Sequence, residues 1–414
     1  MLTLETFLCP VLGLSSVSLL LCAQRGRASL KTLKGLILPG ALIMGFYGYC
    51  IVIEGGVDLS RYYRQILQFH QMSLATILER DTEFLYTRDI LFWAISWLGK
   101  PQLLAFVVGF TIYGISFYIL YDQICRSGYI FSWFEILQLT VIVIGSISPF
   151  YVISTVRSSL SFVSISFAVY RDLVQKKINF ITVALYIIPL GLHIAGLAVV
   201  ILRLMQPFVK RFGFSVLAGA GLLSFFINYL YNYIYGFTMS NPLTQMFYSM
   251  VSKAYFYLNW NEGGYATEIE SSLTNKIFRG YGILFIVLCV ILFAVYNMVE
   301  KKEGMAKASG MFQIPMINYL FLIAVVTLGC LSMKTGGYDR FEWVFVLFSP
   351  VFFVRIMKKD NALLKNIFQI VFLSAVVMGV LNIIWHFRNL EGETITNFIL
   401  FPGVQIVIEA LKRL

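Results

Sequence analysis

The sequence predicts an all-α, polytopic integral membrane protein with about 11 or 12 membrane-spanning helices. Hydrophobic residues make up 59% of the 414 residues, charged residues make up 13%, and the mean hydropathy is +0.79. Apolar runs of about 20 residues, the length that a helix needs to cross a bilayer, recur along the chain. Because lipid satisfies no backbone polar group and the runs are not alternating ten-residue strands, spanning helices are favoured over a barrel.

The expected helices follow the apolar runs, with boundaries soft by about two to four residues. We expect them at residues 3–23, 35–53, 102–121, 131–151, 157–171, 178–202, 213–237, 281–299, 315–333, 341–357 and 367–385. Residues 89–99 are apolar but too short to span, and Lys100-Pro101 follows them, so an interfacial or re-entrant half-helix is predicted there. Residues 1–414 are therefore read as one transmembrane domain, without room for a soluble second domain.

Basic residues orient the chain. The segment after the first apolar run carries Arg25, Arg27, Lys31 and Lys34. Since positive loops stay in the cytoplasm, the N-terminus should face outside, as should residues 54–100, which include the half-helix, and residues 238–280. The net charge of +11 follows from the basic loops and a basic outer surface, and nucleic acid is not implied. The six cysteines, five of them in apolar runs, form no disulfide framework.

The segment around residues 178–202 leaves a choice. Residues 177 and 300 are both expected inside, so the chain must cross the membrane an even number of times between them. Only three helices are obvious there, at residues 178–202, 213–237 and 281–299. Either Pro189 and Gly191 break the run into two half-helices, with residues 203–211 inside, or residues 244–258 form a further crossing. We favour the break, because irregular backbone at membrane depth is tolerated where it lines a cavity.

Two ionisable side chains lie inside otherwise apolar runs. Arg157 lies in VISTVRSSL, residues 152–160, and His193 lies in LHIAGL, residues 192–197. Ionisable groups at such depth usually mark function. Arg157 could instead snorkel to the headgroups, but SPF at residues 148–150 predicts a break and a cavity before it. A lone histidine in an apolar helix is more often a hydrogen-bonded packing residue.

Two polar clusters lie at expected outer helix ends, EGGVDLSRYYR at residues 54–64 and KTGGYDRFE at residues 334–342. Arginine supplies a bidentate fork for phosphate, and tyrosine offers a flat face for a sugar ring. The same chemistry on one membrane face predicts one shared site for an anionic sugar phosphate. The alternatives are an aromatic belt with snorkelling charges and a local ion pair at an exposed turn. The candidate residues are Asp58, Arg61, Tyr62, Arg64, Tyr338, Asp339 and Arg340.

The order of these features resembles the Wzy/EpsG family of bacterial polysaccharide polymerases. Members of that family carry Gly-x-Asp-x-x-x-Tyr after the second helix, and residues 56–62 match it. Glu83, ahead of the short apolar stretch, resembles the family's acidic residue before its next helix. Arg157 and His193 resemble the arginine that opens a helix after an outer turn and the histidine of the next helix. Arg340 lies near the point where the family has a late arginine. Each motif is weak alone, so the order and spacing carry the resemblance.

The resemblance implies an inner-membrane glycosyltransferase with a GT-C-like architecture and an active site that faces the periplasm. Such an enzyme transfers the growing glycan from undecaprenyl diphosphate to a lipid-linked oligosaccharide repeat, with a chain-length regulator protein as a possible partner. Arginines can stabilise the leaving diphosphate without a metal or other cofactor, and Arg157 and Arg340 are the candidates. The base that receives the acceptor's proton stays open among Asp58, Glu83, Asp339 and His193.

Several alternatives stay open. Residues 79–83, ERDTE, supply acidic pairs that could hold a divalent ion, although a solvated charged loop is favoured. An O-antigen ligase relies on the same physical chemistry as the polymerase, so it is the nearest alternative function. A flippase should show duplicated halves or charges distributed along several helices. A membrane O-acyltransferase should have an early essential histidine, but the first histidine, His70, lies in an outer segment.

Overall fold

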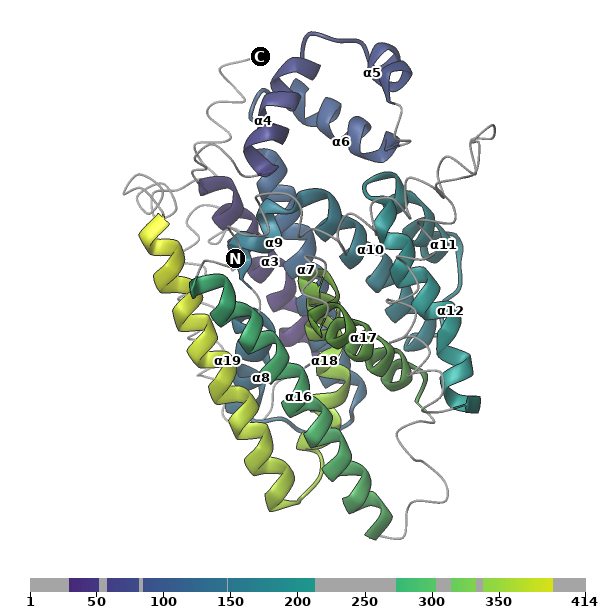
Figure 1. The fold of residues 1–414 in the computed structure, drawn as a ribbon, viewed down its shortest axis with the longest axis vertical. Coiled ribbons are helices and arrows are strands. Elements are labelled where there is room, and N and C mark those ends of the chain that lie inside the picture. Colours follow the sequence, from purple (N-terminus) through teal and green to yellow (C-terminus); the bar gives the residue numbers. More distant parts are fainter. Residues whose placement is uncertain are drawn as a thin grey trace. The chain divides into compact units, whose positions relative to one another are not determined.

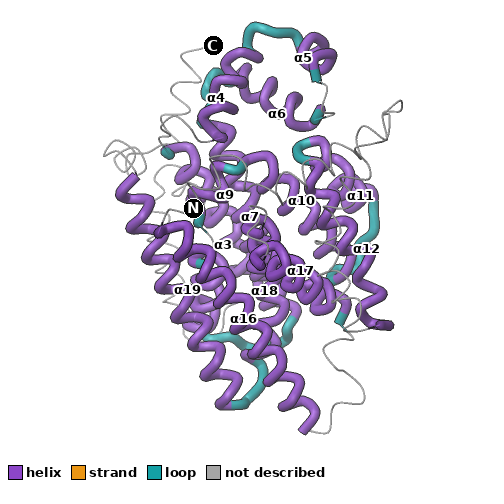
Figure 2. Tube along the Cα trace, in the orientation of Figure 1, coloured by secondary structure: helices purple, strands orange, loops and turns teal. Residues whose placement is uncertain are grey.

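The structure, a computed structural model, describes residues 30–51, 58–81, 85–146, 148–212, 273–302, 314–332 and 338–389. All regular secondary structure in these ranges is helical (Figure 1, Figure 2). Three helical segments here are long and apolar enough to cross a membrane: Leu103–Arg126, Gly280–Glu300 and Ala362–Asn382. The prediction of an α-helical membrane protein is confirmed at this level. The helices expected at residues 3–23 and 213–237 lie outside the described residues, as does the possible crossing at 244–258.

The chain divides into two compact units. The first comprises Met1–Ser164 and Ala375–Leu414, and the second comprises Ile165–Ser374. Two helices contribute residues to both, α10 (Val156–Leu173) and α19 (Ala362–Asn389).

The first unit is built on the pair α3 (Leu30–Cys50) and α7 (Leu103–Arg126), which pack along each other. Glycines let the two backbones approach. A Cβ on Gly48 would lie 2.4 Å from the carbonyl oxygen of Ala105, and a Cβ on Gly109 would lie 2.3 Å from that of Met44. Small residues at such contacts are typical of helices that pack in membranes, where van der Waals contact replaces the hydrophobic driving force.

The prediction of one continuous helix at residues 131–151 is wrong. It consists of α8 (Trp133–Gly145) and α9 (Pro149–Ser154). A capping box between Ser132 and Glu135 starts α8, and Ser148 with Pro149 starts α9. The break predicted from SPF is therefore present, and α10 begins directly after Thr155.

The segment at residues 54–100 contains more helix than the sequence predicted. Besides the short helix α6 (Tyr86–Trp97), it holds α4 (Asp58–Phe69) and α5 (Leu74–Arg80), and α4 packs against α6 (Figure 1). The helix α4 is amphipathic, because Leu59, Tyr62 and Ile66 are spaced at helical intervals and are all buried. These three helices position most of the candidate site.

In the second unit, the segment with His193 is broken as we favoured. The helix α11 (Phe180–Ile187) passes into two short 3-10 turns, Ile188–Gly191 and Ile194–Gly196, and α12 (Leu197–Phe212) follows. Pro189 stands in the first turn. Residues 203–211, expected on the inside, belong to α12, and the side that they face stays a prediction. The helix expected at residues 102–121 extends to Arg126 as α7.

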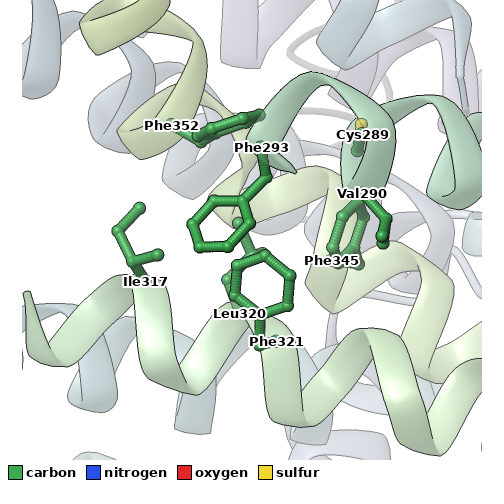
Figure 3. A pocket seen from close by; sticks show the side chains of 8 residues that line it. All are labelled: Cys289, Val290, Phe293, Ile317, Leu320, Phe321, Phe345 and Phe352. Atoms are coloured by element: carbon green, nitrogen blue, oxygen red, sulfur yellow. The ribbon is translucent and has the colours of Figure 1, made fainter. Parts of the chain in front are cut away.

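The rest of the second unit consists of α16 (Leu273–Lys302), α17 (Pro315–Ser332), α18 (Tyr338–Met357) and the beginning of α19. Residues 273–280, expected in an outer loop, are the first turns of α16. Phenylalanines fill the core of this unit, and the rings of Phe293 and Phe321 lie 4.0 Å apart. The small space beside them is lined only by apolar side chains and Cys289 (Figure 3). It offers no polar group to a ligand.

Candidate functional site

Arg157 is fixed by a contact that spans 95 residues of sequence. Its Nε donates a hydrogen bond of 2.8 Å to the hydroxyl of Tyr62, and its guanidinium carbon lies 5.3 Å from the centre of the Tyr62 ring. Arg157 is half-buried, in the first turn of α10. A guanidinium whose Nε is engaged in this way can bind phosphate through its two terminal nitrogens. The structure thus brings together two residues that the sequence placed in separate motifs.

Tyr62 differs from the other members of its cluster. It is 7% exposed and lies on the buried face of α4, where its ring is 5.4 Å from that of Phe92 in α6. Asp58 and Arg61 instead form an exposed ion pair within one turn of α4, and Arg64 is also exposed. Such pairs contribute little to stability. Of this cluster, the contact with Arg157 is made by Tyr62.

Asp89 is a carboxylate of this region that the sequence analysis did not single out. It is 2% exposed, and its Oδ1 accepts a hydrogen bond of 2.7 Å from Arg88 Nε. Burial raises the pKa of Asp89 above its ordinary value, which Arg88 and Arg157 partly counteract and Asp81 reinforces.

Arg88 pairs with two carboxylates, Asp89 next to it in α6 and Asp81 at the end of α5. Besides Asp89, its terminal nitrogen lies 3.6 Å from Asp81 Oδ1, and the exposures of the Arg88 and Asp81 side chains are 12% and 1%. Asp81 is therefore ion-paired, which argues against the metal alternative for residues 79–83. Glu83 itself lies outside the described residues, so its predicted role is not described further.

His193 lies in the second unit, between the two 3-10 turns of the broken segment. It is 9% exposed, and its Nδ1 accepts a hydrogen bond of 3.1 Å from the backbone N–H of Ala195. A nitrogen that accepts carries no proton, so a neutral His193 ring is protonated at Nε2. In this geometry the side chain caps a turn, and Nε2 can donate a hydrogen bond.

A second polar group in this unit surrounds the same broken segment. Arg203 in α12 donates from Nε to Asp172 Oδ2 at 2.8 Å, and the Tyr186 hydroxyl in α11 donates to the same oxygen at 3.3 Å. Asp172 belongs to the last turn of α10. One carboxylate thus ties three helical segments of the second unit together. No sequence pattern predicted this contact, because its partners lie 31 residues apart.

The late cluster is described only in part. Arg340 is a half-buried residue in the first turn of α18, which begins three residues earlier than expected, and Glu342 beside it is buried. The backbones of Tyr338 and Asp339 are helical, but their side chains are outside the described part of the structure. The shared site of the two clusters stays a prediction.

Comparisons of the chain with protein-family models, with curated protein sequences and with solved structures found no match. The described helices and their contacts define the class of the protein, an α-helical membrane protein in which an arginine and a tyrosine from distant segments form a hydrogen bond.

Proposed function

We propose that this protein is a polysaccharide polymerase of the bacterial inner membrane, with an O-antigen or exopolysaccharide repeat as substrate. On this proposal it crosses the membrane about 11 or 12 times in a GT-C-like architecture. Its site faces the periplasm and binds undecaprenyl-diphosphate-linked oligosaccharide. A chain-length regulator would be its protein partner.

The contact between Arg157 and Tyr62 carries the proposal. Both residues belong to motifs in which the sequence resembles the Wzy/EpsG polymerases, and nothing in their sequence separation requires them to meet. Their chemistry also fits the substrate, because a fixed guanidinium suits a diphosphate and an adjoining aromatic ring suits a sugar. A snorkelling arginine would need neither contact.

The reaction moves a glycosyl group. The bond between the sugar's anomeric carbon and the diphosphate oxygen breaks, and its electron pair leaves with undecaprenyl diphosphate. A hydroxyl oxygen of the incoming repeat bonds to the same carbon, and its proton passes to a base. Negative charge grows on the leaving diphosphate in the transition state, where Arg157 stabilises it. Arg340 remains a candidate for the same task, and Asp58, Glu83, Asp339 and His193 remain candidates for the base.

The glycan made by a deletion strain tests the proposal. Without the polymerase, the surface lipid should carry a single repeat instead of a ladder of lengths. A strain that lacks surface glycan and accumulates lipid-linked precursor would instead identify a ligase or a flippase. Complementation with the wild-type gene should restore the ladder, which shows that the loss belongs to this protein.

A further inference from the structure

The short helix α6 carries a row of apolar and aromatic side chains on an exposed side. Tyr86, Ile90 and Trp97 are exposed, Trp97 by 65%, and Trp93 lies between the last two in sequence. Because these four residues are spaced by four, three and four positions, they lie along one side of the helix. Leu98, directly after the helix, is exposed as well. An exposed apolar row of this kind marks a surface that meets another molecule or a membrane.

The connection from α6 to α7 identifies the partner of this exposed row. The helix α7 is long and apolar enough to cross a membrane, and five residues separate its first residue, Leu103, from Trp97. Fully extended, this connection would reach at most about 22 Å. It is shorter than that, because the backbone N–H of Gly99 donates to the carbonyl of Ser96 and that of Leu103 to the carbonyl of Lys100, both at 3.0 Å. Trp97 therefore lies near the level at which α7 enters the lipid.

The composition of α6 suits the plane of the membrane surface. Tryptophan and tyrosine are enriched where hydrocarbon meets water, because each ring is apolar and carries one polar group. With 12 residues, α6 is too short to cross a bilayer. It also carries Arg88 and Asp89, whose Nε and Oδ1 lie 2.7 Å apart, and a re-entrant helix would take both charges into the hydrocarbon. Of the two predicted placements, interfacial and re-entrant, the first is favoured.

The end of α4 lies against the same side of α6. The ring of His70, in the turn after α4, is 6.3 Å from the ring of Trp97, which is 5.8 Å from that of Trp93. Leu67, one helical turn before His70, is exposed. Tyr62 precedes His70 by eight residues, which corresponds to about 12 Å along a helix. The height of α6 in the membrane therefore sets the height of Tyr62.

We propose that the exposed row of α6 binds the membrane surface beside α7 and so holds Tyr62 and Arg157 at the level of the lipid phosphates. The purpose of this height, though not the binding of lipid, rests on the proposed function. The prenyl chain of a lipid-linked substrate occupies the hydrocarbon, so its diphosphate lies at the level of the other lipid phosphates. An arginine at the same level meets the diphosphate without drawing the lipid out of the bilayer.

The depth of Trp97 can be measured without an enzymatic assay, in the full-length protein in nanodiscs of phosphatidylethanolamine and phosphatidylglycerol. Lipids brominated near the headgroup or near the chain end quench tryptophan fluorescence at the corresponding depth, and acrylamide quenches it from water. The emission that is lost in Trp97→Phe belongs to Trp97. We expect this emission to be quenched most by the bromines near the headgroup.

The matched control is Trp343→Phe, which removes a tryptophan only 5% exposed. The emission lost in this variant should be quenched less by either brominated lipid than the emission of Trp97. If acrylamide quenches Trp97 most, the exposed row faces water or a soluble glycan, and the inference is overturned. Strongest quenching by bromines near the chain end would show a re-entrant helix and overturn it equally.

Polymerisation of purified undecaprenyl-diphosphate-linked repeats tests the role of the height. Trp97→Asp places a charge where an aromatic ring meets lipid, so the rate should fall by about 10-fold or more as Arg157 is displaced. Trp97→Tyr keeps an interfacial ring and should polymerise nearly as well as wild type. The control Ala75→Asp adds the same charge at an exposed position of α5 and should leave the rate unchanged.

The outcomes separate the inference from the proposed function. A wild-type rate in Trp97→Asp overturns the role of the height, because the site then works without its contact with lipid. A wild-type protein that polymerises nothing, while bromines near the headgroup quench Trp97, refutes the polymerase and leaves the lipid-binding side of α6 in place.

Discussion

Arg157 and His193 carry the same sequence signal, an ionisable side chain in an apolar segment next to a helix break, but their contacts differ in kind. Arg157 donates a hydrogen bond to a tyrosine 95 residues away. The Nδ1 of His193 accepts from a backbone N–H only two residues away. The first contact joins two distant parts of the chain, and the second caps a turn within its own segment. On the proposed function, the first region would bind the diphosphate, and the cap of His193 would support the break.

The largest effect should come from Arg157→Lys. Lysine keeps the charge but loses the planar fork and the Nε donor to Tyr62, so polymerisation should fall by about 100-fold or more. Arg157→Ala should do worse. Glycan ladders at matched membrane levels measure the loss. A wild-type ladder from Arg157→Lys would show that the residue only snorkels, because an ammonium on a flexible stem reaches the headgroups equally well.

Arg203→Gln should have the next largest effect, on stability. The pair of Arg203 and Asp172 is partly buried, with side chains 21% and 14% exposed, and a hydrogen bond between charged groups is worth about 1.5–3 kcal/mol. Adding Asp172→Asn should restore part of the loss, because the carboxylate is then no longer uncompensated. Thermal unfolding in detergent measures both.

The exposed pair of Arg126 and Asp122 gives the control for that experiment. It has one turn between its partners and an arginine side chain 44% exposed, so Arg126→Gln should cost less than about 0.5 kcal/mol. Equal losses of stability from Arg203→Gln and Arg126→Gln would contradict this prediction. They would show that an ion pair between helices stabilises the protein no more than one within the last turn of a helix.

The sequence predicted much of the fold because hydropathy dictates it. Residues 157–171 were expected as a helix, and α10 runs over Val156–Leu173. The break at Pro189 was expected because proline removes a donor and crowds the preceding turn. The helix α4 was missed, since a search for spanning runs does not register a short amphipathic helix. Its signal was available in the helical spacing of Leu59, Tyr62 and Ile66.

The candidate site was predictable only in its parts. Arg157 and Tyr62 were both singled out, but that one binds the other depends on how α4 packs, which no local pattern encodes. Asp89 was not singled out, because it belongs to residues 89–99, which were interpreted only as a short apolar stretch. Its signal was its place three residues before Phe92, which puts an acidic side chain on the buried face of a short helix.

His193 offers a smaller and sharper test. Loss of a capping side chain costs about 1 kcal/mol, so His193→Ala should lower the unfolding temperature modestly. Asparagine has an oxygen that can accept the same backbone N–H, and His193→Asn should restore stability and activity. If His193→Asn is stable but polymerises poorly, the histidine takes part in the reaction, as its resemblance to the family histidine implies.

The dependence of stability on pH should reveal Asp89. Its pKa in the folded protein is raised, first by burial, and its charged neighbours are Arg88, Asp81 and Arg157. The folded state therefore binds the proton of the Asp89 carboxyl more tightly than the unfolded chain, in which the pKa of that carboxyl is about 3.8. Stability from this group is present below that pH and is lost as pH rises through the folded pKa. Asp89→Asn cannot titrate, so its stability relative to wild type should improve across that window. A constant difference in unfolding temperature would contradict the raised pKa.

The smallest expected effect is that of metal removal. If arginines stabilise the leaving diphosphate, purified protein should polymerise lipid-linked repeats equally well in excess chelator. Asp81 agrees with this expectation, because its side chain is ion-paired with Arg88 and a cation there would compete with that guanidinium. Activity that is lost in chelator and restored by magnesium or manganese would instead assign the charge stabilisation to a metal at residues 79–83. Arg157 would then only orient the diphosphate. Arg157 and His193 would differ less than we propose, because the metal and neither of these residues would stabilise most of the negative charge in the transition state.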